Sequence, residues 1–176
     1  SEILPGLRLG GLSDAKRAIR QREDVAFLCL LPTADAKSQD GLPQLFGEQG
    51  APGPLLFVDI RDEAQQAGRM RGALPECVDF VDAQRRAGRS CIVFCRWGQS
   101  RSATVVIAYL MLRHRYSLHR AFWHVRRIRE NAFPNVGFFR MLQEMDGELF
   151  GRVSMDEAPV EYLAINLNKQ VVPTTP

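Results

Sequence analysis

The segment from Ser90 to Leu112 constrains the fold more than any other part of the chain, because two apolar runs in it enclose a short polar loop. Cys91 to Cys95 is short, apolar and contains β-branched residues, which predicts a buried strand. Ala103 to Leu112 is longer and apolar throughout, which favours a buried helix. The segment therefore predicts a strand, a tight loop and a helix, in that order.

The loop between these two elements has the composition of an anion-binding site. A loop that turns from a strand into a helix directs successive backbone N–H groups into one concavity, where the helix dipole adds a positive potential. Gly98 allows a backbone angle that a side chain would resist. Arg101 can hold two phosphate oxygens with its planar guanidinium group. We therefore expect this loop to bind a phosphate group.

Cys95 lies at the start of the same loop, at the mouth of the predicted anion site. The nucleophilic form of a cysteine is its thiolate, which is favoured near helix N-termini and near cations. A nucleophile held next to a bound phosphate group is what phosphoryl transfer requires. The sequence thus predicts that Cys95 attacks a bound phosphoryl group.

These residues resemble the signature of the cysteine-dependent protein tyrosine phosphatase superfamily, which is a Cys, five residues and an Arg, matched here by Cys95 and Arg101. The form Cys-x-x-Gly-x-Ser-Arg-Ser, followed by Ala-Tyr-Leu-Met, is similar to the dual-specificity branch. Further along, residues 134–138 read Pro-Asn-Val-Gly-Phe and match a second element of that family. The resemblance covers roughly residues 4 to 150. One departure is Phe94, which stands where the family usually has His.

The resemblance implies hydrolysis of phosphotyrosine and of phosphoserine or phosphothreonine in a phosphorylated protein substrate, through a phosphocysteine intermediate. Cys95 would be the nucleophile, and Ser102 would hydrogen-bond its sulfur and help it leave. The residues expected to bind the substrate are Arg96, Trp97, Gly98, Gln99, Ser100 and Arg101. Arg101 would also stabilise the transition state. The chemistry needs no cofactor and no metal.

The general acid of the family is an Asp in a loop after a strand, some distance before the Cys. The run Val58-x-Ile60-x-Asp62 fits that pattern, so Asp62 is the candidate that protonates the leaving group. Asp59 is the second choice, because a position within the strand is more constrained.

The remaining pattern predicts an α/β fold with a central mixed, mostly parallel sheet and helices on both faces. The expected strands lie at residues 7–9, 25–31, 55–60 and 91–95. One helix is expected directly after Ser13, which can cap it, and the others lie at residues 74–87, 103–112, 118–130 and 135–150. Residues from Thr33 to Pro54 are expected to form a loop. The site should lie at the carboxyl end of the strand that carries Cys95.

Two parts of the chain are distinguished by this pattern. Residues 1–150 are expected to form the dual-specificity phosphatase catalytic domain, and residues 151–176 a C-terminal tail. Within the tail, residues 162–172 could add a strand or pair with another chain, and could equally be disordered.

Composition sets broad limits on partners and location. The net charge of +3 is too small to argue for nucleic-acid binding, and no run has the length of a membrane span or the pattern of a signal peptide. The four cysteines lack the spacing of a disulfide framework. We therefore expect a cytoplasmic protein, with a nuclear location left open; the pattern does not determine the oligomeric state.

Several alternatives stay open at this level. A phosphate-binding pseudophosphatase with little turnover is favoured by Phe94, while phosphatases of phosphoinositide or of RNA 5′-phosphate are further alternatives. Trp97 could stack on a substrate or brace the loop. The arginines at positions 120, 126, 127 and 129 could form a solvated face or attract acidic substrates.

Overall fold

A computed structural model describes residues 1–37 and 52–157 of the chain. In this part, the strands form one five-stranded sheet with the order β1-β2-β5-β3-β4. The strands are β1 (Glu2–Leu4), β2 (Leu7–Gly11), β3 (Val25–Leu31), β4 (Leu55–Asp59) and β5 (Ser90–Cys95). β1 is antiparallel to β2, and the other pairs are parallel. The predicted mixed, mostly parallel sheet is therefore confirmed.

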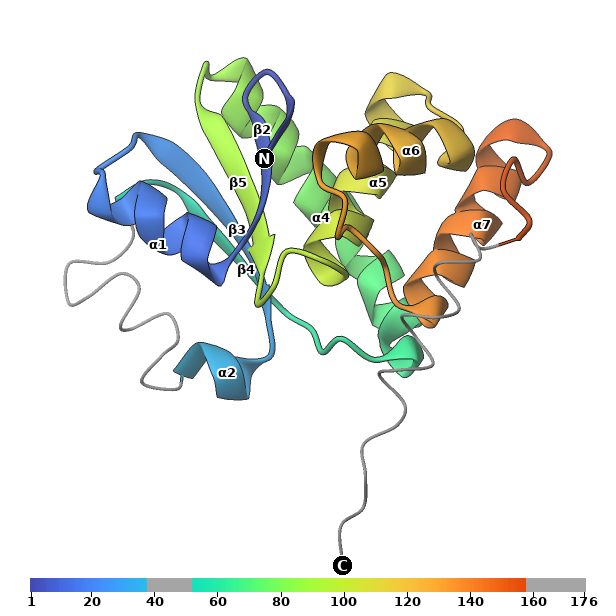
Figure 1. Ribbon diagram of the computed structural model, residues 1–176, viewed down its shortest axis with the longest axis horizontal. Helices are drawn as coiled ribbons and strands as arrows, with labels where there is room; N and C mark the ends of the chain where they lie inside the picture. Colours follow the sequence, from blue (N-terminus) through green and yellow to red (C-terminus); the bar gives the residue numbers. More distant parts are fainter. Residues whose placement is uncertain (38–51, 158–176) are drawn as a thin grey trace, which may run out of the picture.

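Helices cover both faces of this sheet (Figure 1). α1 (Leu12–Arg20) lies on one face. The helices on the other side are α4 (Ala67–Arg86), α5 (Arg101–His114), α6 (Leu118–Ile128) and α7 (Val136–Phe150). Two shorter elements, α2 (Thr33–Lys37) and the 3-10 helix η1 (Ala64–Gln66), follow β3 and β4 respectively. Among the described residues, no helix is both long and apolar enough to span a membrane.

The central strand β5 separates two apolar cores, because successive side chains of a strand point to opposite faces. Phe94 belongs to the smaller core under α1, where its ring meets the edge of Phe27 at 6.4 Å between centroids. Val93 and Cys95 belong to the larger core, which α4 to α7 cover. This alternation directs Cys95 away from α1 and towards α5.

The start of α4 differs from the sequence-based expectation. The helix begins at Ala67 rather than near residue 74, and Pro75 lies inside it. A proline inside a helix removes one backbone hydrogen bond. The helix nevertheless continues because its apolar side chains Met70, Leu74 and Val78 are buried against the sheet.

Two other local expectations are corrected. Ser13 does not cap α1: the N-cap is Gly11, whose N–H donates to the Asp14 carboxylate at 2.9 Å. Residues Thr33–Lys37 form α2, although they were expected to be loop. Residues 38–51 and residues 162–172, for which an extra strand is one alternative, lie outside the described residues.

The predicted caps of the two following helices are confirmed. The Ser117 side chain accepts a hydrogen bond from Arg120 N–H at the start of α6. The Asn135 side chain accepts one from Phe138 N–H, at 3.0 Å, at the start of α7.

The environment of Phe94 generates a prediction about stability. Phe94→His would bury an imidazole in an apolar core, and we expect it to lower the free energy of unfolding by about 1–3 kcal/mol more than Phe94→Leu does. Burial lowers the pKa of a histidine, so the unfolded state would bind more protons than the folded state. The stability that Phe94→His loses relative to Phe94→Leu should therefore grow as the pH falls through about 6.5.

Urea unfolding of both variants at about pH 8 and about pH 5.5 measures this difference. Equal stability of Phe94→His and Phe94→Leu at both pH values would contradict an apolar environment around this side chain.

Candidate active site

The loop between β5 and α5 lies at the carboxyl end of the central strand (Figure 1). Each peptide carbonyl from residue 96 to residue 100 accepts a hydrogen bond from a donor outside the loop. The pairs are Leu12 N–H to Arg96 O (3.1 Å), Arg129 Nη2 to Trp97 O (3.1 Å), Arg129 Nε to Gly98 O (2.8 Å), Phe133 N–H to Gln99 O (2.7 Å), and Thr104 N–H and Oγ1 to Ser100 O (2.8 Å each).

This pattern determines where the loop amides point. In a trans peptide the carbonyl and the N–H point in opposite directions, so carbonyls turned outward leave the amides turned inward. Successive inward amides at the start of a helix form an anion-binding concavity. The loop backbone therefore has the arrangement that an anion-binding concavity requires.

Arg129, at the C-terminal end of α6, holds two of these carbonyls from behind the loop. Its side chain is largely buried, and its Nη1 also lies 3.7 Å from Asp14 Oδ2. Asp14 in turn accepts the Gly11 N–H. Arg129 therefore connects α6, the loop and the start of α1. Sequence analysis grouped this residue with a basic helix face, because nothing in its spacing distinguishes it from the neighbouring arginines.

Gly98 is required both by its backbone and by its surroundings. Its φ is +68°, in the left-handed region that favours glycine. A Cβ at this position would lie 2.5 Å from the Gly10 carbonyl and 2.5 Å from Arg129 Nη2. A side chain here would therefore separate the loop from β2 and from Arg129.

The Cys95 sulfur is buried at the base of this loop. Gly98 N–H donates to Sγ at 3.3 Å, and the Ser102 hydroxyl lies 3.2 Å from it. The sulfur is thus within hydrogen-bond reach of one backbone amide and one hydroxyl. Elsewhere in the structure, burial raises the pKa of the Cys77 and Cys91 thiols to about 12, and it raises the pKa of Cys29 as well. Those three cysteines therefore remain protonated at neutral pH.

Arg101 is 5% exposed and has an unused donor. Its Nη1 donates to the Ile60 carbonyl at 3.3 Å, while its buried Nε has no hydrogen-bond partner among the residues that the structure describes. Buried guanidinium N–H groups are rarely left unpaired in folded proteins. The unpaired Nε therefore identifies a place for an acceptor, such as a phosphate oxygen, beside the loop amides.

Asp62 is positioned from two sides. Its Oδ1 accepts from the Ser100 hydroxyl and from Asn135 Nδ2 at 2.9 Å, and the Ser100 hydroxyl accepts from Asn135 N–H at 2.9 Å. Its Oδ2 has no hydrogen-bond partner in the described part of the chain. Sequence analysis identified Asn135 only as a helix cap, and its bond to Asp62 was not foreseen.

The segment that carries Asp62 is brought close to α7 by a small residue. A Cβ at Gly137 would lie 2.2 Å from the Ala64 carbonyl, so only glycine lets η1 pack against the start of α7. The second candidate acid, Asp59, is in a different setting. The Thr33 amide, with a contribution from Arg69, holds the pKa of Asp59 below its usual value, which favours the ionised form.

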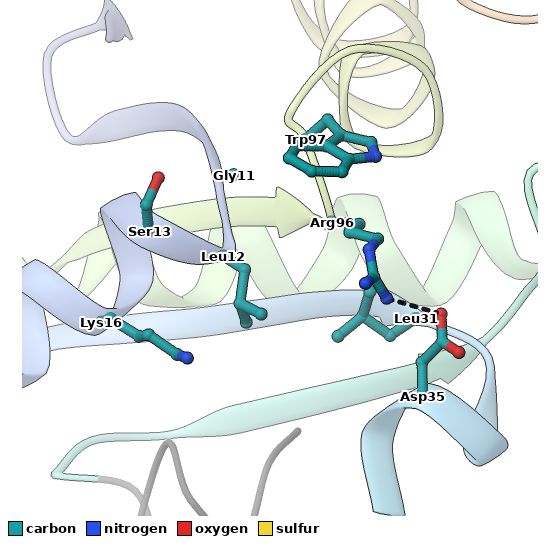
Figure 2. Close-up of a pocket in the computed structure, with 8 residues that line it drawn as sticks. All are labelled: Gly11, Leu12, Ser13, Lys16, Leu31, Asp35, Arg96 and Trp97. Atoms are coloured by element: carbon teal, nitrogen blue, oxygen red, sulfur yellow. Dashed lines mark ion pairs between the residues drawn. The ribbon is translucent and has the colours of Figure 1, made fainter. Parts of the chain in front are cut away.

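The side chains of Arg96 and Trp97 line a neighbouring pocket, in which Arg96 extends towards Asp35 (Figure 2). Arg96 forms an ion pair with Asp35 at 3.7 Å, and the Trp97 side chain is 66% exposed. Trp97 therefore does not brace the loop by packing inside it. No group of three or more potential metal-ligating side chains occurs among the described residues.

Comparison with known proteins, by family model and by sequence, relates the chain to one family. Residues 51–148 match the family described as dual specificity phosphatase, catalytic domain. The chain is 49% identical over 95 residues to dual specificity protein phosphatase 1 of Arabidopsis thaliana, covering 54% of this chain and 48% of that protein. It is 34% identical over 146 residues to human dual specificity protein phosphatase 22, covering 83% and 73%. The matched part spans about half the length of the Arabidopsis relative.

Solved structures show the same similarity. Human DUSP28 aligns with a TM-score of 0.67 and 30% identity, covering 85% of this chain and 97% of that one. The human tyrosine phosphatase-like serine/threonine/tyrosine-interacting protein aligns with a TM-score of 0.70 and 30% identity, covering 84% and 95%.

The contacts of Arg129 generate a prediction about the loop. Arg129→Lys keeps the charge near Asp14 but loses the planar group that binds two carbonyls. We expect hydrolysis of a small aryl phosphate to fall about 10-fold or more, because lost hydrogen bonds of this kind are worth about 1–3 kcal/mol.

The matched control is Arg127→Lys, since Arg127 is exposed and has no such contact. An Arg129→Lys enzyme as active as the Arg127→Lys enzyme would show that the loop does not depend on this residue.

Proposed function

Because the chain belongs to the dual specificity phosphatase family, we propose that it hydrolyses phosphate monoesters of tyrosine and of serine or threonine in phosphorylated proteins. The observation that carries this proposal is the buried Arg101, whose Nε lacks a partner beside a loop of inward amides. The same loop places the Cys95 sulfur at its base. An anion site with a nucleophile beneath it suits phosphoryl transfer better than binding alone.

In the first step, the loop amides and Arg101 bind the phosphoryl oxygens. The Cys95 thiolate attacks phosphorus, and the bond between phosphorus and the leaving oxygen breaks. Asp62 Oδ2 gives its proton to that oxygen, so the alcohol or phenol leaves neutral. The hydrogen bonds to Oδ1 from Ser100 and Asn135 hold the carboxyl group while leaving Oδ2 free for this transfer.

In the second step, water attacks the phosphocysteine. Asp62, now ionised, accepts a proton from that water, and the bond between sulfur and phosphorus breaks. The Ser102 hydroxyl, 3.2 Å from Sγ, donates a hydrogen bond that stabilises the departing thiolate. The products are inorganic phosphate and the regenerated enzyme.

Cys95→Ser tests the nucleophile. We expect turnover of a small aryl phosphate to disappear, while inorganic phosphate still binds, because the amides and Arg101 remain. Initial rates and calorimetric titration with phosphate measure the two properties. Turnover retained in Cys95→Ser would overturn the proposal. Phosphate binding by the wild-type chain without any turnover would instead support a binding module.

Asp62→Asn tests the general acid. A general acid matters most when the leaving group is a poor one, so we expect about 10²-fold loss with an alkyl-like leaving group and little loss with nitrophenolate. Asp59→Asn serves as the matched control, and we expect it to show no dependence on the leaving group. The reverse outcome, with the dependence in Asp59→Asn, would exchange the two roles.

A further inference from the structure

A pocket of about 360 Å³ lies next to the phosphate-binding loop, on the side of α1 and α2 (Figure 2). It lies at the carboxyl ends of β2 and β3, the two strands that flank β5. Arg96 and Trp97, the two residues after Cys95, form the wall that the pocket shares with the loop. The proposed reaction uses neither side chain.

The pocket combines an apolar surface with charged groups. Leu12, Leu31 and the exposed indole of Trp97 supply the apolar part. Arg96 lies with its guanidinium carbon 5.8 Å from the centre of the Trp97 ring and pairs with Asp35 on α2. Its charge is therefore balanced within the pocket.

Lys16 gives the pocket an excess positive charge. It is half-buried on α1, and in Figure 2 it extends in the direction of Leu31 and Asp35. Within residues 1–37 and 52–157, neither its ammonium group nor the Ser13 hydroxyl has a hydrogen-bond or ion-pair partner. Two cations and one anion therefore line the pocket, and one cation and one hydroxyl remain available to a ligand.

We propose that this pocket recognises an acidic side chain, aspartate or glutamate, close in sequence to the phosphorylated residue of the substrate. The inference rests on the proposed function, because it requires a phosphorylated peptide on the loop. With the phosphoryl group at Arg101, neighbouring residues of an extended peptide reach the shared wall of Arg96 and Trp97. The methylene groups of such a side chain would contact Leu12 and Trp97, and its carboxylate would bind the Lys16 ammonium group.

The test uses a set of phosphotyrosine peptides in which one glutamate is moved through the positions on both sides of the phosphotyrosine. Matched peptides carry glutamine or lysine at the same positions. For the wild-type chain we expect glutamate at one position to raise kcat/KM about 2- to 5-fold over glutamine, the size expected of a partly exposed ion pair. The gain should lie in KM, because the contact is equally strong before and during the reaction.

Lys16→Glu should remove this preference and favour the lysine peptide at the same position. Arg20→Glu is the matched control: it makes the same change of charge one turn further along α1, at an exposed residue outside the pocket. The Arg20→Glu enzyme should keep the preference for glutamate. Both variants should hydrolyse a small aryl phosphate as fast as the wild-type chain.

Two results would overturn the inference. One is a wild-type enzyme with no preference for glutamate at any position. The other is an equal loss of preference in Lys16→Glu and Arg20→Glu, which would indicate long-range attraction rather than binding in the pocket. Failure of the proposed function is seen separately, since it would abolish turnover of the aryl phosphate itself.

Discussion

The outward direction of five consecutive carbonyls is the constraint on which the site depends. The donors come from several parts of the fold, so the loop amides face inward only when α1, α5 and the end of α6 are in place. Arg129 holds more of these carbonyls than any other residue, because its planar side chain binds two of them, and it also lies near Asp14. The anion site is therefore a product of the whole domain rather than of the loop alone.

The position of Cys95 follows from a simpler rule. Side chains alternate along β5, so Phe94 enters the small core beneath α1 and Cys95 points the other way, towards α5. There its sulfur meets the Gly98 amide and the Ser102 hydroxyl. The aromatic residue before Cys95 thus belongs to the core of one face, and the Cys95 sulfur lies on the other.

Most of the fold could be predicted because apolar periodicity and capping residues report local structure. The strands of the parallel sheet and the helices after Ser117 and Asn135 follow from such patterns. The prediction of α4 was wrong at its start, because Pro75 signals a helix boundary locally while the buried face of the helix overrides it. Burial against the sheet is a tertiary property, which the local signal of Pro75 does not report.

The sequence by itself determined which residues the proposed chemistry uses: a Cys, a Gly and an Arg at loop spacing between a strand and a helix, with an Asp after an earlier strand. It did so because these residue types have few other uses in that order. Only the tertiary structure decided which other side chains surround these residues. The contacts of Arg129 behind the loop, the bond of Asn135 to Asp62, and the pocket that Lys16 and Trp97 both line join elements far apart in the chain. They depend on how the helices pack on the sheet.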